Sequence, residues 1–300
     1  MIFIAELLLA KPDWLKIRLP TDKYPHVKGI EQKYGIATIC TEGKCPNLSE
    51  CWSSGTATFM IMGDTCTRGC RFCNVKTSRM PRPLDKDEPR KLVQAIKEMK
   101  TFDYIVLTSV DRDDLPDQGS SHFAECISSL KKEIPGLLVE VLIPDFTGNK
   151  KLIDQIIESG PDVIAHNIET VESLQRKVRD PRANYRQSLS VLEYVKSKNP
   201  RIITKSSIML GFGEKEEEVI QTMKDLLKVG VEIFTLGQYL RPSIKHTQII
   251  EYVHPIKFNH YKEIGESLGF RFVASGPMVR SSYKAGELFI KHILNNNMGS

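Results

Sequence analysis

The stretch Cys66–Cys73 reads CTRGCRFC and places three cysteines within eight residues, with three and then two residues between them. It directly follows the apolar run Thr58–Met62, whose length and composition predict a short buried strand. The cysteine loop therefore begins at the carboxyl end of a strand. Parallel α/β sheets and barrels carry their chemistry at that end.

Three thiolates so close together suit the corners of a cubane iron–sulfur cluster. Gly69 lets the backbone fold tightly around such a cluster, and Phe72 shields one side of it. Four irons and three thiolates leave one iron open to a substrate-like ligand, such as the amino and carboxylate groups of S-adenosylmethionine. A structural zinc site would instead need a fourth cysteine or histidine nearby, and the next histidine is the distant His122.

Downstream of this loop, short apolar runs alternate with amphipathic helical patterns. The expected strands are Thr58–Met62, Tyr104–Thr108, Leu137–Ile143, Asp162–Asn167, Ile202–Leu210 and Val231–Gly237. The expected helices are Pro89–Met99, Ser121–Ile134, Asn149–Ser159, Tyr185–Ser197, Glu214–Val229 and Phe258–Leu268. The alternation predicts a parallel sheet with right-handed crossovers, either a doubly wound layer or a full or partial barrel.

A second group of cysteines lies upstream, at Cys40, Cys45 and Cys51, with no fourth thiol beside it. Six of the seven cysteines fall between positions 40 and 73, a clustering that favours metal ligation in a reducing compartment over disulfides. The seventh, Cys126, lies on an expected helix and is interpreted as a buried core thiol.

Composition and charge are those of an ordinary globular protein. The net charge is +5 with both signs interspersed, which is too small a surplus to indicate nucleic acid. It is compatible with docking a modestly acidic partner, although a normal solvated surface is the simpler interpretation. No apolar run approaches the roughly 18 residues of a membrane span. Met1–Ala10 lacks a basic leading segment and reads as a helix, and no Arg- and Ser-rich transit segment precedes it, so a cytoplasmic location is expected.

The two cysteine groups indicate a particular family when they are considered together with a third motif. Cys40–Trp52 follows the pattern C-x4-C-P-N-x3-C-W, and residues 280–283 read RSSY. Together with CTRGCRFC, these motifs resemble lipoyl synthases, a family of the radical SAM superfamily. The resemblance extends over roughly residues 12 to 290 and includes the stretches 108–114, 166–170, 178–184, 205–211 and 236–239.

The resemblance implies a fold and a division of the chain. The expected fold class is α/β: a partial (β/α)6 TIM-like barrel of the radical SAM type over residues 56–275. Residues 1–55 would form an N-terminal extension that carries the auxiliary-cluster cysteines. Residues 276–300 would form a C-terminal extension with the RSSY motif. Both extensions are expected to close over the barrel mouth.

The activity implied by the resemblance is sulfur insertion at C6 and C8 of a protein-bound N6-octanoyl-lysine, which gives the lipoyl cofactor. The cofactors would be two [4Fe–4S] clusters and S-adenosyl-L-methionine. The Cys66, Cys70 and Cys73 cluster would cleave S-adenosylmethionine to a 5′-deoxyadenosyl radical that abstracts hydrogen. The cluster on Cys40, Cys45 and Cys51 would be the sulfur source. Its fourth ligand would be Ser282, with Ser281 as the alternative.

Residues at strand ends are candidates for holding S-adenosylmethionine. Asn167 and Glu169 suit ribose hydroxyls or the methionyl ammonium, and Arg179 suits the methionyl carboxylate. Ser207 opens a stretch that loosely matches the superfamily's glycine-rich motif on the adenine side. Glu140 is expected to point into the barrel. Each of the five could equally belong to a buried structural network.

The implied partners are octanoylated lipoyl carrier domains, either 2-oxoacid dehydrogenase E2 subunits or the glycine cleavage H protein. An electron donor such as ferredoxin or flavodoxin is also implied, and the expected state is a monomer. Two alternatives stay open from the residues. One is another sulfur-inserting radical SAM enzyme, similar to biotin synthase or a methylthiotransferase. The other is a zinc-stabilised binding module, which would be colourless where iron–sulfur clusters would be brown.

Overall fold

The computed structural model describes residues 10–15, 24–48, 51, 58–99 and 104–282. The expected N-terminal helix lies almost entirely outside these residues. Ordered elements precede the barrel at Asp13–Leu15 (η1), Tyr24–Tyr34 (α1) and Ile39–Glu42 (α2).

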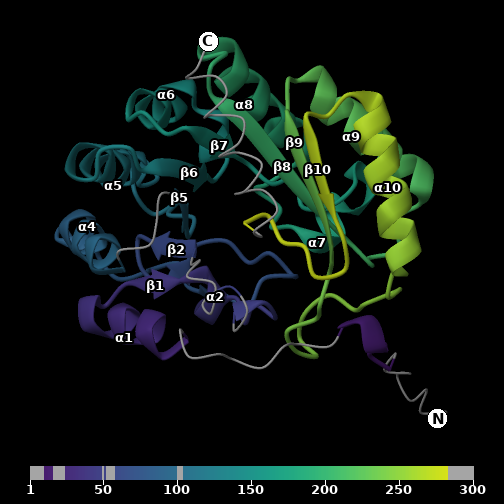
Figure 1. The fold of residues 1–300 in the computed structure, drawn as a ribbon, viewed down its shortest axis with the longest axis horizontal. Helices are drawn as coiled ribbons and strands as arrows, with labels where there is room; N and C mark the ends of the chain where they lie inside the picture. Colours follow the sequence, from purple (N-terminus) through teal and green to yellow (C-terminus); the bar gives the residue numbers. More distant parts are fainter. Residues whose placement is uncertain (1–9, 16–23, 49–50, 52–57, 100–103, 283–300) are drawn as a thin grey trace.

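One curved sheet forms the centre of the molecule (Figure 1). Its strands, in spatial order, are β1 (Ala37–Thr38), β2 (Thr58–Ile61), β5 (Tyr104–Ser109), β6 (Leu138–Leu142), β7 (Val163–Ala165), β8 (Ile203–Leu210), β9 (Ile233–Gln238) and β10 (Phe272–Ser275). Every neighbouring pair is parallel except β1 and β2. In the described part of the chain β1 and β10 are edges, so the sheet is an open barrel.

Helices cover the outer face of this sheet (Figure 1). They are α4 (Glu88–Met99), α5 (Ser120–Glu133), α6 (Lys150–Glu158), α8 (Tyr185–Lys198), α9 (Glu216–Lys228) and α10 (Pro255–Leu268). Side-chain caps begin several of them: Asn149 accepts from the Lys151 amide, and Asn184 from the Gln187 amide. Shorter elements lie in the loops at Phe146–Gly148 (η2), Glu172–Leu174 (η3), Gln175–Val178 (α7), Thr65–Cys66 (β3) and Lys76–Thr77 (β4).

All six expected strands and all six expected helices of the barrel are present, with ends shifted by a few residues. The predicted α/β partial barrel is therefore confirmed. The two-residue strands β1, β3 and β4 were not expected, and neither was β10, which is only four residues long and lies beside the expected C-terminal extension. β10 adds a seventh parallel strand next to β9.

The inner and outer faces of the sheet are filled differently. Apolar side chains pack between the outer face and the helices, and Cys126 is fully buried there on α5, as predicted. Inside the barrel, one apolar layer closes the end where the strands begin; it comprises Tyr104, Val106, Val163, Ile203 and Ile233. The carboxyl ends of the strands remain open above this layer and surround a cavity.

Candidate functional site

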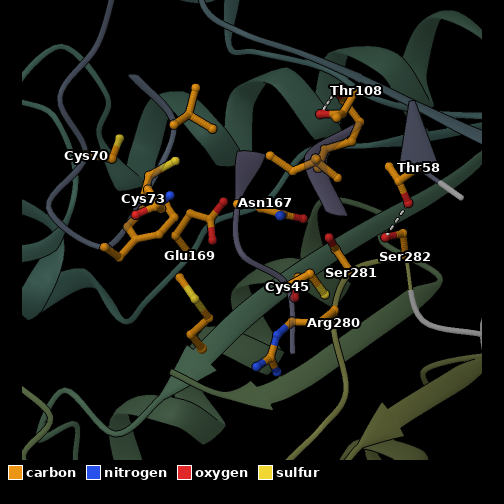
Figure 2. A pocket seen from close by; sticks show the side chains of 18 of the residues that line it. Cys45, Thr58, Cys70, Cys73, Thr108, Asn167, Glu169, Arg280, Ser281 and Ser282 are labelled. Atoms are coloured by element: carbon orange, nitrogen blue, oxygen red, sulfur yellow. Dashed lines mark hydrogen bonds between the residues drawn. The ribbon is translucent and has the colours of Figure 1, made fainter. Parts of the chain in front are cut away.

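The cavity has a volume of about 770 Å³ and is lined by all six clustered cysteines. Figure 2 shows Cys70 and Cys73 on one side of it, and Cys45 with Ser281 and Ser282 on the other. Segments from both ends of the chain therefore meet the carboxyl ends of the strands. This is the position at which barrel enzymes place their chemistry.

The first cysteine loop joins β3 to β4 and is fixed by bonds to loops far along the chain. The Thr67 amide donates to the Asp111 carbonyl at 3.0 Å, and the Gly69 amide donates to the Asp180 carboxylate at 2.8 Å. The Arg71 amide donates to the Val178 carbonyl at 2.9 Å. These bonds fix the loop that carries the three thiols.

The sulfur atoms of this loop receive backbone N–H groups. The amides of Arg68 and Asp111 lie 3.4 and 3.3 Å from the Cys66 sulfur, and the Asp180 amide lies 3.3 Å from the Cys70 sulfur. Burial raises the pKa of each of the three thiols, including Cys73, to about 12. Such thiols stay protonated at neutral pH unless a metal ion binds them. The backbone N–H groups that point at the Cys66 and Cys70 sulfurs would therefore stabilise thiolates bound to a metal.

Behind this loop, the guanidinium of Arg68 is buried among carboxylates. It lies 2.8 Å from Asp113, 2.9 Å from Asp145 and 3.3 Å from Asp111. These carboxylates follow β5 and β6. Arg68 and its three carboxylates, called here the Arg68 cluster, therefore join the cysteine loop to the ends of two strands. Removing the guanidinium would leave several buried carboxylates without a counter-charge, which is costly.

The second cysteine group is held by a run of tight turns. The Cys45 amide donates to the Cys40 carbonyl at 3.0 Å, and the Cys51 amide donates to the Asn47 carbonyl at 2.8 Å. The Asn47 side-chain amide donates in turn to the Met278 carbonyl at 2.5 Å. The turns therefore fix the segment that carries the three cysteines and join it to the C-terminal segment.

The C-terminal segment, residues 276–282, enters the barrel interior beside β9. A side chain at Gly237 could not be accommodated, because its Cβ would lie 1.9 Å from the Val279 carbonyl oxygen. Arg280, Ser281 and Ser282 then line the cavity with Cys45 (Figure 2). Both serines lie on the same side of the cavity as Cys45 (Figure 2), and the Ser282 hydroxyl accepts a hydrogen bond from Thr58.

Asn167 and Glu169 project into the cavity near Cys73 (Figure 2). Glu169 has a φ of +69°, a conformation that a residue with a side chain adopts only when its surroundings enforce it. Bonds to β8 on both sides of it supply that constraint: the Glu169 amide donates to Ser207, and the Met209 amide donates to Glu169. Burial raises the pKa of the Glu169 carboxyl.

Arg179 and Ser207 also line the cavity, but their side chains already have protein partners. The Arg179 guanidinium donates to Gln175 at 3.1 Å and to Ser188 at 2.9 Å. The Ser207 hydroxyl donates to the Thr235 carbonyl at 3.3 Å. Of the five residues predicted to hold S-adenosylmethionine, four therefore surround the cavity.

Glu140 is the exception, and the prediction for it needs correction. It does not line the cavity; its carboxylate lies 2.7 Å from the Lys205 ammonium, and both residues are 1% exposed. The Tyr104 hydroxyl also donates to Glu140. Lys205 projects inward from β8 and neutralises the carboxylate, so Glu140 is a structural ion-pair partner within the barrel.

The sequence prediction missed several residues of the site. Arg68 lies inside the quoted cysteine motif, and Gln238 in the stretch 236–239, but neither received a role. The Gln238 side chain donates to the carbonyls of Leu210, Tyr239 and Glu251 and accepts from the Val253 amide. The signal available in the sequence was the position of this Arg and this Gln inside stretches that resemble the family.

The donor set fits the groups that the motifs imply. Two separate sets of three thiols face one cavity, with a serine hydroxyl on the side of the second set. The side-chain carbonyl oxygens of Asn47 and Asn167 are buried there and have no hydrogen-bond partner among the residues that the structure describes. Buried acceptors of this kind suit a polar ligand that carries N–H or O–H groups.

Comparison with known proteins defines the class. The sequence model of the Radical SAM superfamily matches residues 60–226. The fold is similar to that of the FeFe-hydrogenase maturase from Carboxydothermus hydrogenoformans, with a TM-score of 0.53 and 14% identity over 89% of this chain and 78% of that chain. It is also similar to methylornithine synthase, with a TM-score of 0.50 and 17% identity over 76% of this chain and 63% of that chain.

Curated relatives define the family more narrowly. The mitochondrial lipoyl synthase of Culex quinquefasciatus is 57% identical over 294 residues, covering 96% of this chain and 77% of that protein. The mitochondrial lipoyl synthase of Schizosaccharomyces pombe is 53% identical over 295 residues, covering 96% and 80%. The chain therefore belongs to the lipoyl synthase family, within the radical SAM superfamily.

Membership confirms the predicted enzyme class and sets aside the zinc-stabilised binding module and the other sulfur-inserting enzymes. The family implies S-adenosylmethionine and a [4Fe–4S] cluster as cofactors, a reductant, and a lipoyl carrier protein as substrate. The predicted cytoplasmic location is wrong, because the curated relatives are named mitochondrial and point to the mitochondrion. Within the described residues, no helix has the length and apolarity needed to cross a membrane.

Proposed function

We propose that this enzyme inserts sulfur at C6 and C8 of an octanoyl-lysine on a carrier domain and consumes a second [4Fe–4S] cluster as the sulfur source. The single observation that carries this proposal is the shared cavity, in which two complete sets of three cysteines face one space. One set serves a reusable cofactor in this scheme, and the other holds a substrate of the reaction.

The first set, Cys66, Cys70 and Cys73, would hold the catalytic cluster. When bound, that cluster and S-adenosylmethionine supply a one-electron cleavage that yields a carbon radical able to take hydrogen from an unactivated methylene. The chain's own contribution is to position them. The N–H groups on the Cys66 and Cys70 sulfurs stabilise thiolate charge, and the Arg68 cluster keeps the loop rigid.

The residues beyond β7 would orient S-adenosylmethionine. Burial raises the pKa of the Glu169 carboxyl, and a methionyl ammonium bound beside it would favour its charged form. Asn167 offers an unpaired carbonyl oxygen to a ribose hydroxyl, and Arg179 offers a guanidinium to a carboxylate. Ser207 contributes to the wall of the cavity.

The second set, Cys40, Cys45 and Cys51, would hold the sulfur-donating cluster with Ser282 as fourth ligand and Ser281 as the alternative. The second set lines the same cavity as the first. A cluster held there could therefore deliver sulfur to a carbon that has just lost hydrogen. The partly buried guanidinium of Arg280 lies beside Cys45 (Figure 2) and would offset negative charge there. A serine alkoxide binds iron less firmly than a thiolate, which suits a cluster that must come apart.

Two features of the wider arrangement remain part of the proposal. Residues 1–55 and 276–300 act as extensions that cover a barrel over residues 56–275, which the entry of residues 276–282 into the barrel supports. The carrier is an E2 subunit or H protein, ferredoxin or flavodoxin supplies electrons, and the enzyme acts as a monomer.

The test is anaerobic turnover with S-adenosylmethionine, a reductant and an octanoylated carrier domain, read by mass spectrometry of the lysyl group. The unmodified enzyme should add two sulfur atoms. Cys66→Ser should abolish cleavage of S-adenosylmethionine. Cys45→Ser should retain that cleavage and lose sulfur insertion. If the Cys45 variant inserted sulfur normally, the role proposed for the second set would be wrong.

A further inference from the structure

Two segments of the chain, residues 71–84 and 240–250, carry positive charge without any acidic residue. They contain six basic residues and no acidic one; the six are Arg71, Lys76, Arg79, Arg82, Arg241 and Lys245. The whole chain has 42 Lys and Arg against 37 Asp and Glu, so removing these six leaves 36 against 37. The two short stretches together contribute +6, which is one more than the net charge of the whole chain.

The two segments lie together at the opening of the cavity. The Thr247 amide donates to the Arg71 carbonyl at 2.9 Å, and a ring nitrogen of His246 lies 3.0 Å from the Cys73 carbonyl. Both segments line the cavity on one side, through Phe72 and Thr77 from the first and Leu240 to Pro242 from the second. Their other side faces solvent, so together they form a rim of the opening, called here the mouth surface.

The basic side chains of the mouth surface are largely uncompensated. Of the six, only Lys76 forms an ion pair with another described residue, Asp64, at 2.6 Å. The rim also carries apolar side chains: Met80 is 86% exposed and Ile244 76%, the highest exposures among the large apolar residues described. One of these lies in each segment. Exposed apolar groups set among like charges are typical of an interaction site.

We propose that the mouth surface docks the acidic face of the carrier domain that presents the octanoyl-lysine. This rests on the proposed function and names the surface chemistry of its partner. Acylation converts the lysine to a neutral amide, so the arm that enters the cavity carries no charge. A basic rim can attract only acidic groups on the domain around that lysine, and such attraction speeds encounter and sets orientation.

A carrier protein fits this surface better than a membrane or a nucleic acid. Neither segment contains a helix, and binding at a membrane interface normally relies on an amphipathic helix. Met80 and Ile244 provide apolar contacts of the kind found at protein interfaces, which a phosphate backbone does not match.

The test compares an octanoylated carrier domain with a short octanoyl-lysyl peptide, using the holoenzyme at low and high salt. The test variant is Arg79→Glu/Arg82→Glu/Lys245→Glu, since none of the three lines the cavity. Its KM for the carrier domain should rise at least about tenfold at low salt and less at high salt. The kcat at saturation and the KM for the peptide should stay within about twofold of the unmodified enzyme, since only encounter with the domain is altered.

The matched control reverses three basic residues at the opposite end of the barrel, Lys132→Glu/Arg201→Glu/Lys228→Glu, which should leave both KM values unchanged. An unaltered KM for the carrier domain in the test variant would overturn the docking proposal. Equal losses on domain and peptide would overturn it too, as would a variant that loses only binding to anionic phospholipid vesicles. If the unmodified enzyme adds sulfur to neither substrate, it is the proposed function that fails.

Discussion

The Thr58 hydroxyl donates a hydrogen bond of 2.9 Å to the Ser282 hydroxyl (Figure 2). Thr58 begins β2, and Ser282 is the last described residue of the chain, 224 positions later. The C-terminal segment leaves β10, passes Gly237 on β9 and reaches β2 on the other side of the barrel. This single bond therefore connects the two sides of the open barrel at the residue proposed to complete the second cluster.

Replacing Thr58 by Val removes this donor while keeping the shape of the side chain. A hydrogen bond of this kind contributes about 1 kcal/mol, which corresponds to about fivefold in an equilibrium constant. We expect Thr58→Val to lose iron from the second site about fivefold more readily. Iron release to an anaerobic chelator, measured in a background with Cys66, Cys70 and Cys73 replaced by Ala, reports that site alone. Thr58→Ser keeps the hydroxyl and should retain iron as the unmodified protein does. Equal iron release from Thr58→Val and Thr58→Ser would contradict the idea that the Thr58 hydroxyl positions Ser282.

Replacing Ser282 by Cys tests whether a labile ligand is needed. A thiolate binds iron more firmly than an alkoxide, so the second cluster should form and remain intact. Sulfur insertion should fall strongly while S-adenosylmethionine cleavage continues. Full turnover in Ser282→Cys would contradict the idea that release of this ligand helps the cluster come apart. The same exchange at Ser281 provides the matched comparison, because both serines line the cavity.

Replacing Gly237 by Ala should displace the C-terminal segment. The added Cβ would lie 1.9 Å from the Val279 carbonyl oxygen, so the backbone around Val279 must shift. We expect far-UV circular dichroism and S-adenosylmethionine cleavage to persist and sulfur insertion to be lost. Gly29→Ala, a position where a Cβ meets nothing within 4 Å, serves as the control. Normal sulfur insertion by Gly237→Ala would show that the segment's path is unimportant.

The buried pair of Glu140 and Lys205 supports the barrel rather than the chemistry. Lys205→Met leaves the carboxylate buried without its counter-charge and should destabilise the fold by about 3–5 kcal/mol. Glu140→Gln in the same chain removes the stranded charge and should recover most of the loss. Midpoints of thermal unfolding, measured anaerobically, give the comparison. A double variant no more stable than Lys205→Met would contradict this account.

His166 should make stability depend on pH. Burial lowers its pKa to about 4, with the nearby Arg179 acting in the same direction, against an ordinary value of 6.5. Between those two pH values the unfolded chain binds a proton that the folded chain does not, so stability falls as pH falls from 6.5 to 4. The loss is on the order of 3 kcal/mol. His166→Gln should flatten this part of the denaturation profile, and an unchanged slope would count against it.

Much of this site could be anticipated because its ligands are local in sequence. Cys66, Cys70 and Cys73 fall within one loop, and the strand before them places that loop at the end of the barrel that carries chemistry. The partner of Glu140 could not be predicted in this way. Alternation along β6 predicts that its side chain points inward, but only the structure shows that Lys205 on β8 neutralises it. The carboxylates around Arg68 could not be predicted either, because they come from separate loops that only the fold brings together. The concentration of basic residues at the cavity opening was visible in the sequence as charge, but the adjacency of its two segments was not.

The central claim is that the second cysteine set carries the sulfur that the product receives. Enzyme whose clusters are rebuilt with a heavy isotope of sulfide can be turned over once, anaerobically, on an octanoylated carrier domain. Mass spectrometry of the modified lysine should show two heavy sulfur atoms in the unmodified enzyme and none in Cys45→Ser. A product that carries only light sulfur, or no sulfur at all, would contradict the claim.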